Sequence, residues 1–241
     1  MNFDDPRRLY FFFDYISHNA YLAWCEIRAL ATRHRLELEP VPVLFAGLLS
    51  HYKQVGPAEV LAKSRWMLWN VLRKAKIHGI ALAPPHSHPF NPLVPLRVSC
   101  AAAGVIEKDL KSPALALGAA ESAARIDLVD RLFRATWAES RAVSESATVR
   151  SVLEESGLDA DALMLQAQSE PIKQRLRQNT QDAIESGVFG VPAMRVRGEL
   201  FWGFDDLEYL DMFLRGDDPL HADRQAYQDW FQVKPSAERK R

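Results

Sequence analysis

Cysteine is scarce in this sequence, whose 241 residues include only Cys25 and Cys100. They form no close pair and no metal knuckle, and two cysteines are too few for a disulfide framework. His86 and His88 stand two positions apart in a proline-rich turn with no third ligand nearby, which is weak evidence for a metal. The sequence therefore predicts neither a disulfide scaffold nor a metal site.

An excess of charge of one sign is also absent, and so are long hydrophobic runs. The 30 lysines and arginines balance 31 aspartates and glutamates without a concentrated basic block, which argues against nucleic acid or an anionic membrane as the main partner. The aromatic run at residues 9–13 stops at Asp14, too short for an export signal or a membrane span, and acids occupy the N-terminus where a signal peptide is basic. We expect a cytoplasmic protein.

Fingerprints of common cofactor sites are missing too. The chain has no glycine-rich dinucleotide motif, no P-loop and no His-Glu-x-x-His pattern, and it contains no internal repeat. Its length predicts one large domain, or two small ones that share a core. The order of the predicted elements and the residues at their ends must therefore indicate the function.

The opening of the chain is typical of a strand–helix–strand unit. Residues 9–13 are uniformly apolar, which predicts a strand buried on both faces. Helix formers fill residues 21–31, with Ser17 or Asn19 as the N-cap. Residues 36–43 alternate apolar and polar, which predicts a second strand with prolines at its exit, and a right-handed crossover makes the two strands parallel.

Helical patterns fill the middle of the chain, and a strand pair closes it. The long helical stretches are expected at residues 58–77, 92–103, 114–140 and 142–155. Strands at 193–196 and 199–202 flank Arg197-Gly198, a hairpin signature, and precede a helix at 205–214. The tail from Arg215 is charged and is expected to fray. This order predicts an open α/β sheet interrupted by an all-helical subdomain.

Two turns are candidates for chemistry. Ser17 follows the first strand, where the next helix presents free N–H groups and a partial positive charge to a ligand, although the simpler interpretation is that Ser17 only caps that helix. Pro192 precedes the late strand. It is either an ordinary turn proline or part of a cis-proline loop that faces Ser17, in which Val191 pairs its backbone with an extended peptide.

Several spaced motifs between residues 9 and 214 resemble one known family. They are Phe13-Asp14-Tyr15-Ile16-Ser17 with Ala20-Tyr21-Leu22-Ala23, Gln54-Val55-Gly56-Pro57-Ala58-Glu59 with Lys63, His88-Pro89-Phe90-Asn91-Pro92-Leu93, Gly187-Val188-Phe189-Gly190-Val191-Pro192, and Phe201-Trp202-Gly203-Phe204-Asp205. Together they resemble the 2-hydroxychromene-2-carboxylate isomerase family and the related kappa-class glutathione transferases. The resemblance implies an α/β, thioredoxin-like fold of the DsbA type with a large all-helical insertion.

The resemblance also implies a division of the chain. It comprises an N-terminal extension at 1–8, a thioredoxin-like domain in two segments at 9–45 and 180–215, a helical insertion at 46–179, and a tail at 216–241. A homodimer and a small aromatic-derived substrate are implied as well. Since Ser17-His18-Asn19-Ala20 stands where a disulfide oxidoreductase has Cys-x-x-Cys, disulfide exchange is not expected.

Glutathione is the cofactor that the resemblance implies, with Ser17 as the catalytic residue. Ser17 would donate a hydrogen bond to the glutathione sulfur and hold it as a thiolate. This agrees with the physics, because a helix N-terminus and a hydroxyl donor lower the pKa of a thiol. Val191, before a cis Pro192, would pair its backbone with the cysteinyl part. Asp205 would meet the γ-glutamyl ammonium, although it also suits a plain N-terminal helix acid.

The insertion supplies further expectations and two departures from the family pattern. Gln54 and Lys63 fall where the insertion contacts the tripeptide, but many relatives carry Asn in place of Gln54, and Lys63 alone suggests a solvated helix face. His18 replaces the usual proline after the serine. It is either a base or a partner for an acidic substrate, or a neutral exposed residue, which is the favoured interpretation. The three tryptophans on predicted helices are expected in the core or as a substrate wall: Trp66, Trp69 and Trp137.

The implied reaction is an isomerisation with a borrowed thiol. The thiolate adds to a conjugated carbon of an aromatic-derived 2-oxo acid, the double bond becomes a rotatable single bond, and elimination returns glutathione. Three alternatives remain: a kappa-like transferase or peroxidase that consumes glutathione, a non-enzymatic binder of glutathione or hydrophobic ligands, and a DsbA-type oxidoreductase. The missing cysteines disfavour the last.

Overall fold

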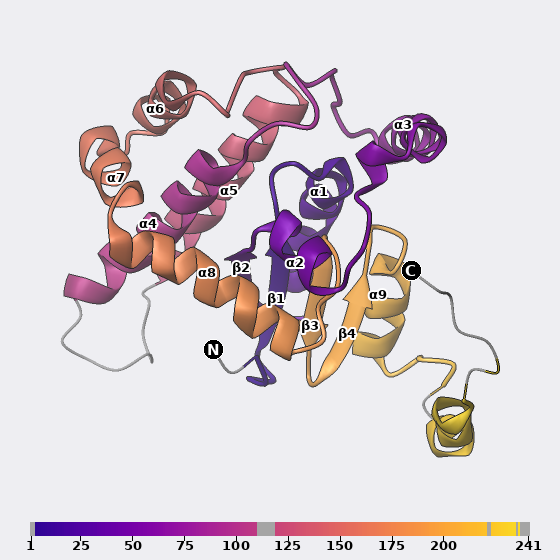
Figure 1. Ribbon diagram of the computed structural model, residues 1–241. Helices are drawn as coiled ribbons and strands as arrows, with labels where there is room; N and C mark the ends of the chain where they lie inside the picture. Colours follow the sequence, from indigo (N-terminus) through magenta and orange to yellow (C-terminus); the bar gives the residue numbers. More distant parts are fainter. Residues whose placement is uncertain (1–2, 110–118, 221–222, 235, 237–241) are drawn as a thin grey trace.

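A mixed four-stranded sheet forms the centre of the computed structural model, which describes residues 3–109, 119–220, 223–234 and 236 (Figure 1). The strands lie in the order β2-β1-β3-β4. Strands β1 and β2 are parallel, as predicted, and the other two neighbouring pairs are antiparallel. Their bounds are Arg8–Phe13 for β1, Glu37–Pro42 for β2, Ala193–Val196 for β3 and Glu199–Trp202 for β4.

Strand β1 is buried on both faces, as its uniform apolar sequence predicts. Leu9, Phe11 and Phe13 belong to the larger apolar core, whereas Tyr10 and Phe12 belong to a smaller one on the opposite face. Pro42 ends β2, as predicted, and Pro40 lies within the strand. An edge strand tolerates them because one row of its backbone groups has no partner in the sheet.

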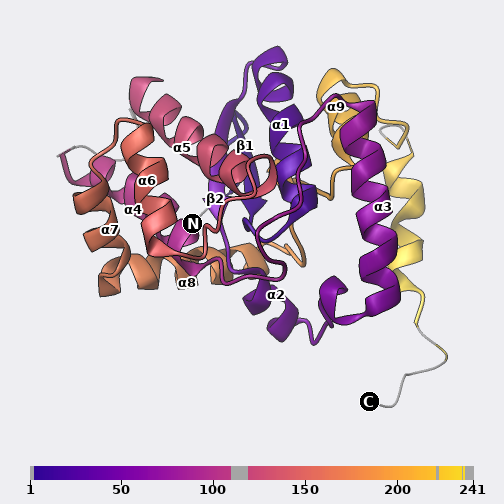
Figure 2. The same cartoon turned by 90° about the horizontal axis from the view of Figure 1, so that it is seen from above.

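Helices cover both faces of this sheet. The bounds are His18–Arg33 for α1, Phe45–His51 for α2, Pro57–Glu59 for η1, Leu61–Ile77 for α3, Leu93–Asp109 for α4, Ala119–Trp137 for α5, Ser146–Glu155 for α6, Ala160–Ala167 for α7, Glu170–Glu185 for α8, Leu207–Arg215 for α9 and Arg224–Gln232 for η2. Helices α1 and α9 lie on one face, and α2 and α8 lie on the other (Figures 1 and 2). Helices α4 to α7 gather beyond β2, and α3 lies on the opposite side, past α1 (Figure 2).

Several predicted helix limits are wrong by a few residues. The helix expected at 142–155 begins at Ser146, because residues 141–145 form a turn in which the Glu145 N–H donates to the Ala142 carbonyl. The closing helix begins at Leu207 rather than 205, because the Asp206 carboxylate accepts from the Trp202 N–H and keeps the chain in a turn. The start of the helix expected at 114–140 lies outside the described residues.

The structure of the tail differs from the prediction, and helices cross the predicted boundaries between the thioredoxin-like domain and the insertion. The tail contains the 3-10 helix η2 where fraying was predicted, although its described side chains are exposed. The larger core joins sheet residues such as Phe13 to insertion residues such as Leu132 and Phe133. Helices α2 and α8 run across the limits at 45/46 and 179/180, so the two-segment division stays a prediction.

Candidate functional site

The turn between β1 and α1 is held by backbone and side-chain hydrogen bonds. The Ser17 N–H donates to the Asp14 carbonyl at 3.0 Å, and the Ser17 hydroxyl oxygen accepts from the Ala20 N–H at 3.1 Å. This geometry confirms Ser17 as the N-cap of α1. The first turn of α1 contains no acidic residue, so its free N–H groups and partial positive charge favour an anion at Ser17.

The loop before β3 faces this serine. The Val191–Pro192 peptide bond is cis. The Ser17 hydroxyl donates to the Val191 carbonyl at 3.4 Å, which is long for an O–H···O bond. Because that bond is weak, a better acceptor displaces it at little cost. The structure thus confirms the cis-proline loop opposite Ser17.

Gly190 lets this loop pass close to a tryptophan. A Cβ atom at this position would lie 2.6 Å from Nε1 of Trp202, a separation that real Cβ atoms essentially never show. Trp202 ends β4 and is half exposed. A side chain at position 190 would therefore force the Trp202 ring to move, and glycine just before Val191 lets the loop and the ring pack as they do.

Two rings from the helical insertion close on the same turn. The His18 ring lies 6.0 Å from the His88 ring and 5.7 Å from the Trp137 ring, centroid to centroid. Trp137 donates its Nε1–H to the Tyr15 carbonyl at 2.9 Å, and His88 Nε2 lies 3.1 Å from the Ile16 carbonyl. Since a carbonyl only accepts, this His88 nitrogen carries a hydrogen. The expectation of an exposed His18 is wrong, because these rings half-bury it.

Burial also determines the charge of both imidazoles. Burial, with smaller contributions from the neighbouring His88 and the Lys74 ammonium, lowers the pKa of His18 to about 4. Burial likewise lowers the pKa of His88, against the opposing effect of its hydrogen bond to Ile16. Both rings are therefore neutral at neutral pH, and His18 is too weak a base to take a proton from a thiol.

Asp14 joins the turn to the next helix. Its carboxylate accepts from the Ile16 N–H at 3.1 Å and from the Phe45 N–H, at the start of α2, at 2.9 Å. Burial raises the pKa of this carboxyl to about 7, even though both hydrogen bonds favour the charged form. Asp14 thus fixes the backbone that carries Ser17.

Asp205 lies in the turn before α9 and forms an ion pair with α3. Its Oδ2 is 2.7 Å from Nζ of Lys74, which also lies over the Phe204 ring. The Asp205 side chain is 75% exposed, so its other oxygen remains open to a ligand. Sequence reasoning missed Lys74. It follows Lys63 by about three helical turns on the same face of α3, which is the signal that could have indicated it.

The structure does not bring every predicted residue to Ser17. Gln54 precedes η1 and Lys63 lies in the first turn of α3, and both are exposed. No hydrogen bond or ion pair among the described residues links either side chain to the serine. Trp66 and Trp69 are 62% and 61% exposed, so they are not core residues, whereas Trp137 is buried.

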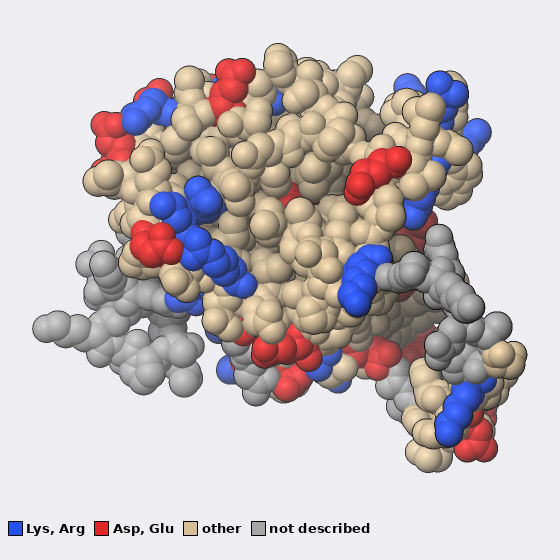
Figure 3. Space-filling model, in the orientation of Figure 1, with Lys and Arg blue, Asp and Glu red and all other residues tan. Residues whose placement is uncertain are grey.

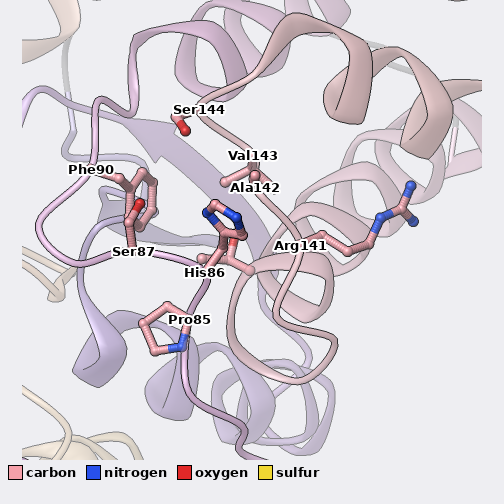
Figure 4. A pocket seen from close by; sticks show the side chains of 9 residues that line it. Pro85, His86, Ser87, Phe90, Arg141, Ala142, Val143 and Ser144 are labelled. Atoms are coloured by element: carbon pink, nitrogen blue, oxygen red, sulfur yellow. The ribbon is translucent and has the colours of Figure 1, made fainter.

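A small cavity lies beside the site but does not contain Ser17. It is a shallow hollow between the turn at 85–90 and the loop at 141–144, with no enclosed space for a water molecule (Figure 4). Arg141 extends away from it in Figure 4, and its guanidinium binds the Glu155 carboxylate instead. Within the described ranges, no group of three His, Cys, Asp or Glu side chains is placed to hold a metal.

Known proteins match this chain over most of its length. A family model described as a DSBA-like thioredoxin domain matches residues 8–215. A 2-hydroxychromene-2-carboxylate isomerase of Sphingobium xenophagum is 28% identical over 206 residues, covering 85% of this chain and 96% of the relative. Glutathione S-transferase kappa 2 of Caenorhabditis elegans is 28% identical over 197 residues, covering 77% and 79%.

A solved structure of 2-hydroxychromene-2-carboxylate isomerase superposes with a TM-score of 0.72. The superposition covers 94% of this chain and 99% of that one, at 24% sequence identity. At this identity the likeness shows the fold alone. The fold is thioredoxin-like with a helical insertion, as the sequence predicts.

Proposed function

This chain belongs to the DSBA-like thioredoxin domain family, and on that premise we propose that it is a glutathione-dependent isomerase of the 2-hydroxychromene-2-carboxylate type. The observation that carries the proposal is the Ser17 hydroxyl at the N-terminus of α1, opposite the Val191–Pro192 loop. Relatives that cover most of the chain are named as isomerases of this type and as kappa glutathione transferases. The serine in place of a cysteine supports a borrowed thiol rather than a resident one.

Ser17 is proposed to hold the glutathione sulfur as a thiolate. An ordinary thiol has a pKa near 8.5 and is mostly protonated at neutral pH. The α1 N-terminus and a hydroxyl donor both favour the anion, and each 1.36 kcal/mol of preference lowers the thiol pKa by one unit. The Ser17 hydrogen would move from the weak bond with the Val191 carbonyl to the sulfur.

The rest of the tripeptide is proposed to lie along the cis-proline loop. The Val191 backbone would pair with the cysteinyl residue as an added strand does. Asp205 would bind the γ-glutamyl ammonium through the oxygen that Lys74 leaves open. Gln54 and Lys63 are exposed on the adjoining segment and would contact glutathione only where it extends that far.

The chemistry that this arrangement supports is reversible addition. The thiolate forms a bond with a conjugated carbon of an aromatic-derived 2-oxo acid, rotation follows about the resulting single bond, and elimination releases the isomer with glutathione. The protein would keep the glutathione sulfur ionised and would orient both reactants. Substrate would lie on the side of Ser17 where the insertion packs against the turn.

A kappa-like glutathione transferase is the second candidate, because the kappa 2 relative covers 77% of this chain. The two functions differ in stoichiometry. With 2-hydroxychromene-2-carboxylate and a hundredfold smaller amount of glutathione, we expect isomerisation to reach equilibrium with the glutathione recovered, and loss of this activity in Ser17→Ala. Consumption of one glutathione per product would indicate the transferase, and glutathione binding without any turnover would indicate a binding protein.

A further inference from the structure

We propose that His18 is a catalytic residue whose neutral imidazole donates its Nε2 hydrogen to the substrate carbonyl oxygen that becomes negative when the thiolate adds. This inference rests on the proposed function and adds to it a residue that serves the substrate rather than glutathione. It is carried by the position of His18 between Ser17 and the insertion, and by the different surroundings of its two ring nitrogens.

The position of His18 separates it from the glutathione side of the site. Ser17 faces Val191 of the sheet half, whereas the next residue packs against His88 and Trp137 of the insertion. The first residue of a helix is also adjacent to the partial positive charge of the helix N-terminus, where a developing anion is stabilised. A second reactant on the insertion side of the thiolate would therefore meet the His18 ring.

The two nitrogens of His18 have different surroundings. Nδ1 is buried and has no hydrogen-bond partner. Nε2 also has no partner within the described chain, but it is not buried. A neutral imidazole carries one hydrogen, and because Nδ1 is enclosed, only Nε2 can present that hydrogen to a ligand; the proposed role therefore requires the Nε2–H tautomer. A ligand thus meets a single N–H donor.

The neighbouring rings cannot take this role, because their donors are already used. His88 donates Nε2–H to the Ile16 carbonyl, and Trp137 donates Nε1–H to the Tyr15 carbonyl. These bonds fix both rings to the turn that carries His18. They form a rigid support that holds the imidazole in place while its Nε2 stays free for substrate.

The burial of His18 and the groups that face its ring both favour the uncharged imidazole. A second hydrogen would have to lie on the buried Nδ1, and the charged or titratable groups that face the ring are Lys74 of α3 and His88 of the turn. Trp137 of α5 carries no charge. The pKa of His18 is about 4, so the ring stays a neutral donor from pH 5 to 8. A neutral donor suits a carbonyl oxygen that gains charge without being protonated.

The step balances without any further reactant. The thiolate sulfur forms a bond with the conjugated carbon, and the electron pair of the carbon–carbon double bond moves onto the carbonyl oxygen as an enolate. His18 hydrogen-bonds to that oxygen and keeps its own hydrogen. After rotation the pair returns, the double bond re-forms and the sulfur–carbon bond breaks, which releases the thiolate.

The test compares two substitutions that differ in their donors. His18→Gln places an amide N–H near the position of Nε2, and His18→Phe keeps the ring volume without a donor. We expect kcat for isomerisation to fall about 100-fold in His18→Phe and less than about tenfold in His18→Gln, since one lost oxyanion donor costs about 10²–10³ in rate. Glutathione affinity and the pKa of bound glutathione should not change. His86→Phe, in the same turn as His88, is the matched control and should keep full activity.

Nitrogen NMR of the wild-type protein gives a second readout that needs no substrate. We expect His18 as a neutral Nε2–H tautomer from pH 5 to 8. Titration of His18 within that range, a hydrogen on Nδ1, or an unchanged kcat in His18→Phe would overturn this role alone. If the wild-type protein fails to bind glutathione or to turn over the substrate, the proposed function fails first, and the role of His18 fails with it.

Discussion

At the scale of single residues, the site depends on the difference between a serine and a cysteine. Ser17 occupies the N-cap of α1, where a thiol would be ionised by the free N–H groups of the helix. The two native cysteines have the opposite environment. Burial raises the pKa of Cys25 to about 11 and that of Cys100 to about 12, so both are inert thiols at neutral pH.

Replacing Ser17 by cysteine should therefore create a single reactive thiol. At pH 7 we expect Ser17→Cys to react with oxidised glutathione, forming one protein–glutathione disulfide and releasing one glutathione thiolate. The wild-type protein, with only its high-pKa thiols, should react at least about tenfold more slowly. Mass spectrometry of the intact protein measures both. Equal labelling of the two proteins would show that the α1 N-terminus does not activate a thiol.

At the scale of secondary-structure elements, Asp14 joins the turn between β1 and α1 to the start of α2, because its carboxylate accepts from the Ile16 and Phe45 N–H groups. This bond pattern fixes the turn that carries Ser17, but it buries a carboxyl group. With a pKa of about 7 in the folded protein and 3.8 as the ordinary value, the folded chain holds a proton that the unfolded chain releases between pH 4 and 7. Raising the pH through this range therefore destabilises the fold.

Comparison with Asp14→Asn isolates this effect. His18 contributes the opposite slope, because its low folded pKa means that stability is lost as the pH falls from 6.5 towards 4. We expect the free energy of unfolding of wild type, relative to Asp14→Asn, to decrease by about 1.4 kcal/mol per pH unit between pH 4 and 7. Urea unfolding at several pH values measures it. A difference that does not change with pH would contradict the buried carboxyl.

Local sequence patterns predicted most helices and strands, whereas contacts between residues distant in the sequence could not be predicted. Ser17 as a cap and the Val191–Pro192 loop follow from residues next to them in the sequence, so both could be predicted. The contact of His88 with the Ile16 carbonyl and the pairing of Lys74 with Asp205 join residues that are distant in the sequence, and no local pattern encodes them. For the same reason the burial of His18 was missed.

At the scale of the whole molecule, charged residues are dispersed over the surface, whereas several exposed large apolar side chains lie together on α3. The face in Figure 3 carries both signs of charge interspersed among other residues. No described helix has the length and apolarity needed to cross a membrane. The exposed large apolar side chains include several on α3, which packs against α1 and leaves one side open: Leu61, Trp66, Leu68, Trp69 and Ile77. We propose that a second copy of the chain covers this face.

Light scattering coupled to size exclusion tests this assembly. We expect wild type at twice the chain mass of 27.3 kDa, and Trp66→Glu with Trp69→Glu at the chain mass with an unchanged fold by circular dichroism. Placing charges in an apolar interface is costly, which is why the double variant should dissociate. A wild-type protein of single-chain mass, or a double variant that remains dimeric, would contradict this interface.

The proposed binding of glutathione to Ser17 as a thiolate can be measured by a pH titration. The ultraviolet absorbance of the thiolate is followed with glutathione bound to wild type and to Ser17→Ala, with Ser50→Ala as a control for loss of a serine elsewhere. We predict a bound thiol pKa at least about one unit below 8.5 in wild type and in the control, and a return towards 8.5 in Ser17→Ala. A bound thiol that titrates at the same pH in all three proteins, or no glutathione binding at all, would show that Ser17 does not hold a glutathione thiolate.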